Sequence, residues 1–177
     1  IRNKGENKPT TAKLYNQLGN AYFRQGNLEA AASSYCLAVQ SCDEVGEHMS
    51  AAYLNLGTVY WRKGDTRNAI QSLQKALSVH KSDMIKQGKS IDESTTAASV
   101  YHQLGLCYAL SKKWSKAISA LMKAKEIRTQ VAGLNDASVA QTLDAIGKVR
   151  FMQGQYDEAL VCHQHAIRSF QAAGVYN

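Results

Sequence analysis

"YLNLGTVYWRKGD", residues 53–65, is the stretch that decides the fold of this 177-residue chain. A Leu-Gly pair lies between two tyrosines, and Gly64 follows shortly after them. An amphipathic helix that ends at Gly64 would account for this pattern, because glycine is common where helices stop. One copy cannot distinguish such a helix from a repeated unit, so the rest of the chain decides between them.

A Leu-Gly or Ile-Gly pair recurs in four aligned segments. They read "YNQLGNAYFRQGNLEAAASSYCLA", "YLNLGTVYWRKGDTRNAIQSLQKA", "YHQLGLCYALSKKWSKAISALMKA" and "LDAIGKVRFMQGQYDEALVCHQHA". The glycines of the pairs are Gly19, Gly57, Gly105 and Gly147. An alanine stands twelve residues after each glycine, and another follows seven residues further on. Such coincidences at three positions indicate an internal repeat.

The pattern resembles the tetratricopeptide repeat, a 34-residue helix-turn-helix unit with the signature W-x2-L-G-x2-Y followed by A-x3-F. The tyrosine of the signature is matched in three copies and replaced by Arg150 in the fourth, and no copy keeps the terminal proline of the family. Successive glycines are 38, 48 and 42 residues apart, so the repeats are long. The segment "VAGLNDASVAQTL" is similar to the junction between the 42-residue repeats of kinesin light chains.

The resemblance implies an all-α fold, a right-handed α-solenoid of four helix-turn-helix units with eight main helices. The composition agrees, since Pro9 is the one proline in the chain and little else would break a helix. We expect a flexible N-terminal segment at residues 1–10 and a single array over residues 11–177. The units are expected at about 12–45, 50–88, 92–132 and 136–173.

Local signals predict where the helices begin and turn. Asn27 and Asp65 are expected to cap the second helices of the first two units. The sequence "SIDE" at 90–93 is predicted to be a capping box that opens the third unit. Lys112 stands where the other units have a turn glycine, so a slightly altered turn is expected there.

The resemblance also implies a concave groove lined by the first helix of each unit. Such grooves bind extended segments or helices of other proteins. The groove residues that we expect to contact a partner are Lys13, Asn16, Gln17, Asn20, Phe23, Arg24, Asn55, Thr58, Trp61, Arg62, His102, Gln103, Leu106, Lys148 and Phe151.

Gln17, Asn55 and Gln103 occupy the same position in three successive units. A carboxamide both donates and accepts hydrogen bonds, so these side chains could hold a peptide backbone whatever its sequence. Alternatively, they solvate the surface or bond within the array. Phe23, Trp61 and Phe151 are candidate anchors for apolar side chains of a partner, and packing on neighbouring helices is the other interpretation.

Some tetratricopeptide proteins hold the acidic C-terminal tail of heat-shock chaperones with a clamp of Lys, Asn, Asn, Lys and Arg. The corresponding residues here are Asn16, Asn20, Asn55, Ser99 and Gln103. Only Asn20 and Asn55 match, and the three cations that would neutralise carboxylates are missing. We therefore do not expect this chain to bind a chaperone tail.

The net charge of +7 is concentrated in residues 61–128, which hold thirteen Lys or Arg and five Asp or Glu. A basic face could attract nucleic acid or an anionic surface, but a solvated helix face is the simpler interpretation. The groove lacks a regular set of side chains that could read nucleic-acid bases, so nucleic-acid binding is not expected.

No phosphate-binding loop, nucleophile elbow or H-E-x-x-H motif occurs, so we expect no enzyme activity and no cofactor.

The four cysteines are scattered, as is typical of reduced thiols in a cytoplasmic protein. The cluster Cys162-His163-Gln164-His165 is a candidate metal site, but its spacing on one helix does not converge on a single ion. No apolar run is long enough to cross a bilayer. Because the chain begins at Ile1, we expect it to be part of a longer protein.

These observations predict a non-catalytic protein-interaction scaffold or adaptor whose groove binds a peptide or helix of a partner. Two alternatives remain open. One is self-association through the terminal repeat, because the last helix would leave an apolar face uncovered. The other is binding of nucleic acid or an anionic surface through the basic face of residues 61–128.

Overall fold

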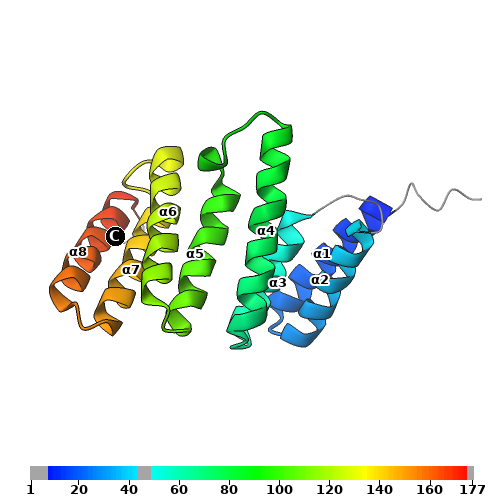
Figure 1. Cartoon of the computed structure of the whole chain (residues 1–177), viewed down its shortest axis with the longest axis horizontal. Helices are drawn as coiled ribbons and strands as arrows, with labels where there is room; N and C mark the ends of the chain where they lie inside the picture. Colours follow the sequence, from blue (N-terminus) through cyan, green and yellow to red (C-terminus); the bar gives the residue numbers. More distant parts are fainter. Residues whose placement is uncertain (1–7, 44–48, 175–177) are drawn as a thin grey trace, which may run out of the picture. The chain divides into compact units, whose positions relative to one another are not determined.

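The structure, a computed structural model, describes residues 8–43 and 49–174, and every regular element in these ranges is a helix (Figure 1). This confirms the predicted all-α class. The elements in chain order are α1 (Lys8–Arg24), α2 (Leu28–Asp43), α3 (Ser50–Arg62), α4 (Thr66–Lys86), the 3₁₀-helix η1 (Ile91–Glu93), α5 (Thr95–Leu110), α6 (Trp114–Ala132), α7 (Ala137–Met152) and α8 (Tyr156–Ala172).

The chain divides into two compact units, Ile1–Ser82 and Asp83–Asn177. In the first unit α1 packs on α2, and α2 packs on α3. In the second unit α5 packs on α6, α6 on α7, and α7 on α8. Each unit therefore contains its own stack of antiparallel helix pairs, as a helical repeat requires.

Close approach of paired helices explains the recurring glycines. A Cβ atom at Gly57 would lie 2.6 Å from Cγ of Leu73, and one at Gly105 would lie 2.5 Å from Cγ of Leu121. Leu73 and Leu121 are completely buried. Only glycine allows the second helix of each pair to seat its large side chain directly against the first helix.

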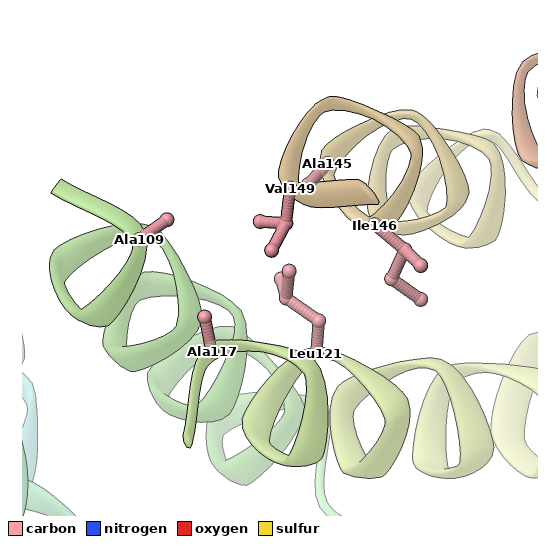
Figure 2. Close-up of a cluster of buried hydrophobic side chains, with 6 residues drawn as sticks. All are labelled: Ala109, Ala117, Leu121, Ala145, Ile146 and Val149. Carbon is pink, nitrogen blue, oxygen red and sulfur yellow. The ribbon is translucent and has the colours of Figure 1, made fainter. Parts of the chain in front are cut away.

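One buried cluster of the second unit joins α5, α6 and α7 (Figure 2). Leu121 projects from α6 toward Ile146 and Val149 of α7, while Ala109 and Ala117 lie beside it. The six residues of this cluster are Ala109, Ala117, Leu121, Ala145, Ile146 and Val149. Small residues beside one large side chain allow three helices to pack with little empty space.

The predicted caps of the second helices are present. The side-chain oxygen of Asn27 accepts a hydrogen bond from the backbone N–H of Ala30 at 3.1 Å. Asp65 accepts one from the N–H of Asn68 at the same distance. Each bond satisfies a backbone donor that the first turn of a helix leaves free.

Two helix starts differ from those that the sequence suggested. Helix α1 begins at Lys8, because a proline such as Pro9 is tolerated in the first turn of a helix. Residues 1–7 lie outside the described residues. The sequence "SIDE" does not open α5: Ser90 caps η1, and it is the side chain of Ser94 that caps α5, accepting from the N–H of Ala97.

The turn between α5 and α6 gives a first testable prediction. Lys112 has φ +55°, whereas the equivalent residues Gly26, Gly64 and Gly154 have φ between +78° and +80°. Glycine adopts this left-handed conformation without steric cost. Lys112→Gly should therefore raise the free energy of unfolding by about 0.5–1 kcal/mol in urea titrations.

Lys113→Gly is the matched control. Lys113 has φ −88°, so glycine gains nothing there and should leave stability unchanged or lower it. If Lys112→Gly is no more stable than Lys113→Gly, the left-handed backbone at Lys112 does not lower the stability of the chain.

Candidate functional site

A hydrogen-bonded amide cluster lies where α1, α2 and α3 meet. The Tyr35 hydroxyl, on α2, donates to Oδ1 of Asn20 at 2.8 Å. The carboxamide Nδ2 of Asn55, on α3, donates to Oδ1 of Asn16 at 3.0 Å and to Oδ1 of Asn20 at 3.2 Å. We call Asn16, Asn20 and Asn55 the amide cluster.

The bonds of the amide cluster leave particular atoms available to a partner. Because both bonds to Asn20 end on its Oδ1, its NH₂ group is left free to donate elsewhere, and no partner for it lies in the described part of the chain. The Oδ1 of Asn55 likewise accepts nothing from the described residues. The cluster therefore offers donors and an acceptor held in fixed positions, as binding a peptide backbone requires.

A pocket of 280 Å³ opens at this cluster. It is lined by Asn20, Phe23, Arg24, Tyr35, Asn55 and Thr58. Five of these residues lie on α1 and α3, and Tyr35 comes from α2. The pocket combines an aromatic ring and a cation with polar hydrogen-bonding groups.

Arg62 covers one side of Phe23. Its guanidinium carbon lies 4.4 Å from the centre of the ring, which is a cation–π contact between α3 and α1. Neither α1 nor α3 contains an aspartate or glutamate. Arg24 and Arg62 form no ion pair with any described residue, so this surface is positively charged and has no carboxylate of its own.

Tyr35 lines the pocket, and the sequence did not reveal this. It stands at the position of Leu73 and Leu121, which are completely buried packing residues. Its ring does pack on Gly19, and its hydroxyl reaches Asn20. Burial raises the pKa of Tyr35, so the hydroxyl remains a donor at neutral pH. The available signal was the tyrosine itself, which differs from the leucines by one polar group.

Three other predicted residues of the first unit do not line this pocket. Lys13 and Gln17 are exposed on α1. Trp61 is partly buried on α3, and its indole Nε1 is fully buried without a hydrogen-bond partner among the described residues. The partial burial of the Trp61 ring agrees with the alternative interpretation, in which this side chain packs on neighbouring helices.

The predicted residues of the second unit do not form a comparable cluster. On α5, Nδ1 of His102 and Oε1 of Gln103 are buried and have no partner in the described ranges. Leu106 packs on the core cluster. On α7, Lys148 pairs with Asp144 at 2.5 Å, and the exposed Phe151 meets the ring of Tyr156 edge-on with centroids 5.3 Å apart.

Arg128 joins α6 to α7, and its charge acts on His102 of α5. Its guanidinium donates to the backbone oxygen of Ser138 at 2.7 Å and to the hydroxyl of Thr142 at 2.6 Å. Burial, with a further contribution from the charge of Arg128, lowers the pKa of His102 from 6.5 to about 4. The folded chain therefore keeps His102 neutral at a pH where the unfolded chain protonates it.

This depressed pKa predicts a loss of stability in mild acid. Stability from a neutral His102 is complete above pH 6.5 and is lost as the pH falls toward 4, because the unfolded state then binds the extra proton. We expect the free energy of unfolding to fall by roughly 1–2 kcal/mol between pH 7.5 and pH 5. Urea titrations at several pH values measure this change.

His102→Leu is the matched variant, because leucine occupies the equivalent position in the second repeat, Leu54. It should remove most of the loss between pH 6.5 and pH 5 and leave the fall below pH 4 that comes from carboxylates such as Asp136, whose pKa is lowered by hydrogen bonds from Ser138. An unchanged slope in His102→Leu would show that another group carries the pH dependence.

The described residues contain no group of three or more His, Cys, Asp or Glu side chains placed to hold a metal ion. His163 pairs instead with Asp144, its Nδ1 lying 3.1 Å from the carboxylate. None of the four cysteines takes part in a disulfide. None of the helices in the described ranges has the length and apolar character needed to span a bilayer.

Comparison with known families decides what kind of protein carries this site. The tetratricopeptide repeat family matches residues 10–82 and 96–172, which is most of the chain. The chain belongs to the tetratricopeptide repeat family. No sequence among the curated proteins matches it. The family predicted from the Leu-Gly pattern is thereby confirmed.

Two solved structures show that tetratricopeptide repeat proteins share this fold. BtubC (BKLC) from P. vanneervenii superimposes with a TM-score of 0.84 at 24% identity, over 99% of this chain and 69% of that chain. MamA superimposes with a TM-score of 0.71 at 23% identity, over 95% of this chain and 83% of that chain. Both likenesses support the α-solenoid class. Tetratricopeptide repeats serve in general as protein-interaction scaffolds without catalysis of their own.

Proposed function

We propose that this tetratricopeptide repeat chain is an adaptor that binds a segment of another protein on the surface formed by α1 and α3. The observation that carries the proposal is the amide cluster, in which Tyr35 and Asn55 fix Asn20 so that its NH₂ group is free at the pocket. Donors held in place lose little entropy when they bind.

The chemistry of this surface indicates the class of segment that it binds. The free NH₂ group of Asn20 suits a backbone carbonyl of the partner. The face of Phe23 that Arg62 leaves uncovered suits an apolar side chain. Arg24 and Arg62, with no carboxylate on α1 or α3, favour a neutral or acidic segment over a basic one.

Part of the basic stretch 61–128 is occupied by internal ion pairs. Lys63 pairs with Glu29 at 2.7 Å, and Lys123 pairs with Asp92 and Glu126, each at 3.0 Å. These cations are less available to nucleic acid than the sequence suggests. Nothing in the described residues favours nucleic-acid binding over the proposed adaptor function.

A peptide-display selection on the 177-residue chain tests the proposal. We expect enriched peptides to share a motif and to bind Asn20→Ala and Asn55→Ala about five- to tenfold more weakly than the wild type, because each change removes about 1 kcal/mol of hydrogen bonding. The matched control is Asn135→Ala, an exposed asparagine between α6 and α7, which should bind as the wild type does.

Tyr35→Phe separates positioning from packing. The ring still fills the space against Gly19, but Asn20 loses the bond that orients its carboxamide. We expect unchanged stability within about 1 kcal/mol and weaker peptide binding. Enriched peptides that bind all of these variants equally, or a preference for nucleic acid over peptides, would overturn the proposed site.

A further inference from the structure

Two helix faces in the described part of the chain carry exposed apolar side chains. The first, which we call the α1 face, consists of Leu14, Gln17, Leu18 and Ala21, all of them exposed. The second, which we call the α8 face, consists of the exposed Tyr156, Leu160 and Ile167 and the partly buried Phe170. Leu160 is 58% exposed and Ile167 is 56% exposed. Exposed apolar residues grouped on one side of a helix indicate an interaction surface.

The α1 face has buried counterparts elsewhere in the chain. Leu18 stands one residue before the repeat glycine, as do Leu56 on α3 and Ile146 on α7. Leu56 packs on α2 and Ile146 packs on α6 (Figure 2). Leu56 is 7% exposed and Ile146 is 4% exposed, whereas Leu18 is 43% exposed. The α1 face therefore has the residues of a helix that packs on a preceding second helix.

The α8 face corresponds to the surface of α6 that α7 covers. Tyr156 and Leu160 stand at the positions of Trp114 and Ile118, both of which pack on the core cluster shared with α7. Phe170 stands at the position of Arg128, which contacts Ser138 and Thr142 of α7. The α8 face thus resembles a surface that receives the first helix of another repeat.

We propose that the α8 face of one copy of the chain packs on the α1 face of a second copy, continuing the helix stack from chain to chain. The partner is a second copy because the chain carries both halves of an interface that it already forms between α2 and α3 and between α6 and α7. The inference goes beyond the proposed peptide binding and does not depend on it.

Size complementarity supports this pairing. A pocket of 560 Å³ lies beside the α8 face and is lined by Asp144, His163, Ala166, Ile167, Phe170 and Gln171. Leu14 stands at the position of Thr142, the α7 residue that meets Arg128 of α6. In the interface between copies, Leu14 therefore comes opposite Phe170. The pocket provides room for Leu14, which is larger than the Thr142 side chain that it replaces.

A polar contact also supports the pairing of the α8 face with the α1 face. Within the first unit Asn55 of α3 donates to Asn16 of the preceding first helix at 3.0 Å. The residue of α1 at the position of Asn55 is Gln17, and the residue of α7 at the position of Asn16 is Asp144. Gln17 of the second copy would therefore donate to a carboxylate, which is a stronger acceptor than an amide.

Pairing of two α8 faces is less suitable. That arrangement does not reproduce the packing of a first helix on a preceding second helix, which the chain forms between α2 and α3 and between α6 and α7. A head-to-tail interface uses two different faces, so each added copy presents a free face for the next. The expected assembly is an open chain whose mass grows with protein concentration.

Light scattering coupled to gel filtration tests the assembly with two complementary variants. Leu18→Asp disables the α1 face and leaves the α8 face intact, whereas Ile167→Asp does the reverse. Each variant alone should be monomeric. An equimolar mixture should form a dimer, because the α8 face of Leu18→Asp can still bind the α1 face of Ile167→Asp.

Leu37→Asp is the matched control, since Leu37 is 43% exposed, as Leu18 is, and lies on neither face. It should assemble as the wild type does, and circular dichroism should show that all three variants are folded. The proposal is overturned if the wild type stays monomeric at its highest soluble concentration or if the mixture does not dimerise. It is also overturned if either single variant dimerises alone, which would show that one face pairs with itself.

Discussion

Replacing Leu121 by alanine is expected to lower the free energy of unfolding of the chain by about 3–4 kcal/mol. Leu121 is completely buried and lies at the centre of the cluster that joins α5, α6 and α7 (Figure 2). Its loss removes contacts with Ile146 and Val149 and leaves a cavity between three helices. The surrounding residues include three alanines, which have no flexible side chains to move into the space.

Urea unfolding followed by circular dichroism measures this loss. Met122→Ala is the control, because Met122 is the next residue of α6 and is 45% exposed. Met122→Ala should lower the free energy of unfolding by less than about 1 kcal/mol. Equal costs for the two variants would mean that the cluster does not hold α6 against α7.

Gly105→Val is expected to lower the free energy of unfolding by about 3 kcal/mol. Its Cβ alone would lie 2.5 Å from Cγ of Leu121 and 3.2 Å from the backbone oxygen of Ala117. The side chain of Leu121 has no room to move, because it is completely buried. Helices α5 and α6 must therefore separate to admit the new side chain.

Gly147→Val is the informative comparison. A Cβ at Gly147 meets the ring of His163 at 2.8 Å, but this ring is only partly buried and can swing toward solvent. We expect Gly147→Val to lower the free energy of unfolding by about 1–2 kcal/mol.

A double variant tests the packing of Gly105 on Leu121. In a Leu121→Ala background, Gly105→Val should lower the free energy of unfolding much less than it does alone, since the cavity accepts the added carbons. Additive costs in that double variant would contradict direct packing of Gly105 on Leu121.

The sequence predicted the repeated helices because the repeat imposes steric requirements that few residues meet. Gly57 and Gly105 must be glycine to admit Leu73 and Leu121. Asn27 and Asp65 satisfy free backbone donors, so the starts of α2 and α4 were also evident. At α5 the signal was ambiguous, because Ser90 and Ser94 can both cap a helix and the choice between them depends on the path of the chain.

The surface of α1 and α3 could be predicted less completely. Position in the repeat placed Asn20, Asn55 and Phe23 on one surface, and all three line the pocket. It did not show that Asn55 bonds to Asn16 and Asn20, because such bonds depend on distances between helices. The same holds for Asp144, whose pairing with Lys148 and His163 brings together residues of α7 and α8.

The measurement that tests the central claim most directly is a titration of the labelled chain with a peptide from the display selection, followed by nuclear magnetic resonance of the asparagine side-chain NH₂ groups. We predict that the largest shifts belong to Asn20 and Asn55, with smaller ones at Asn16, and that Asn135 does not respond. If the peptide leaves these three NH₂ signals unchanged and shifts residues of other helices, the surface of α1 and α3 is not the binding site.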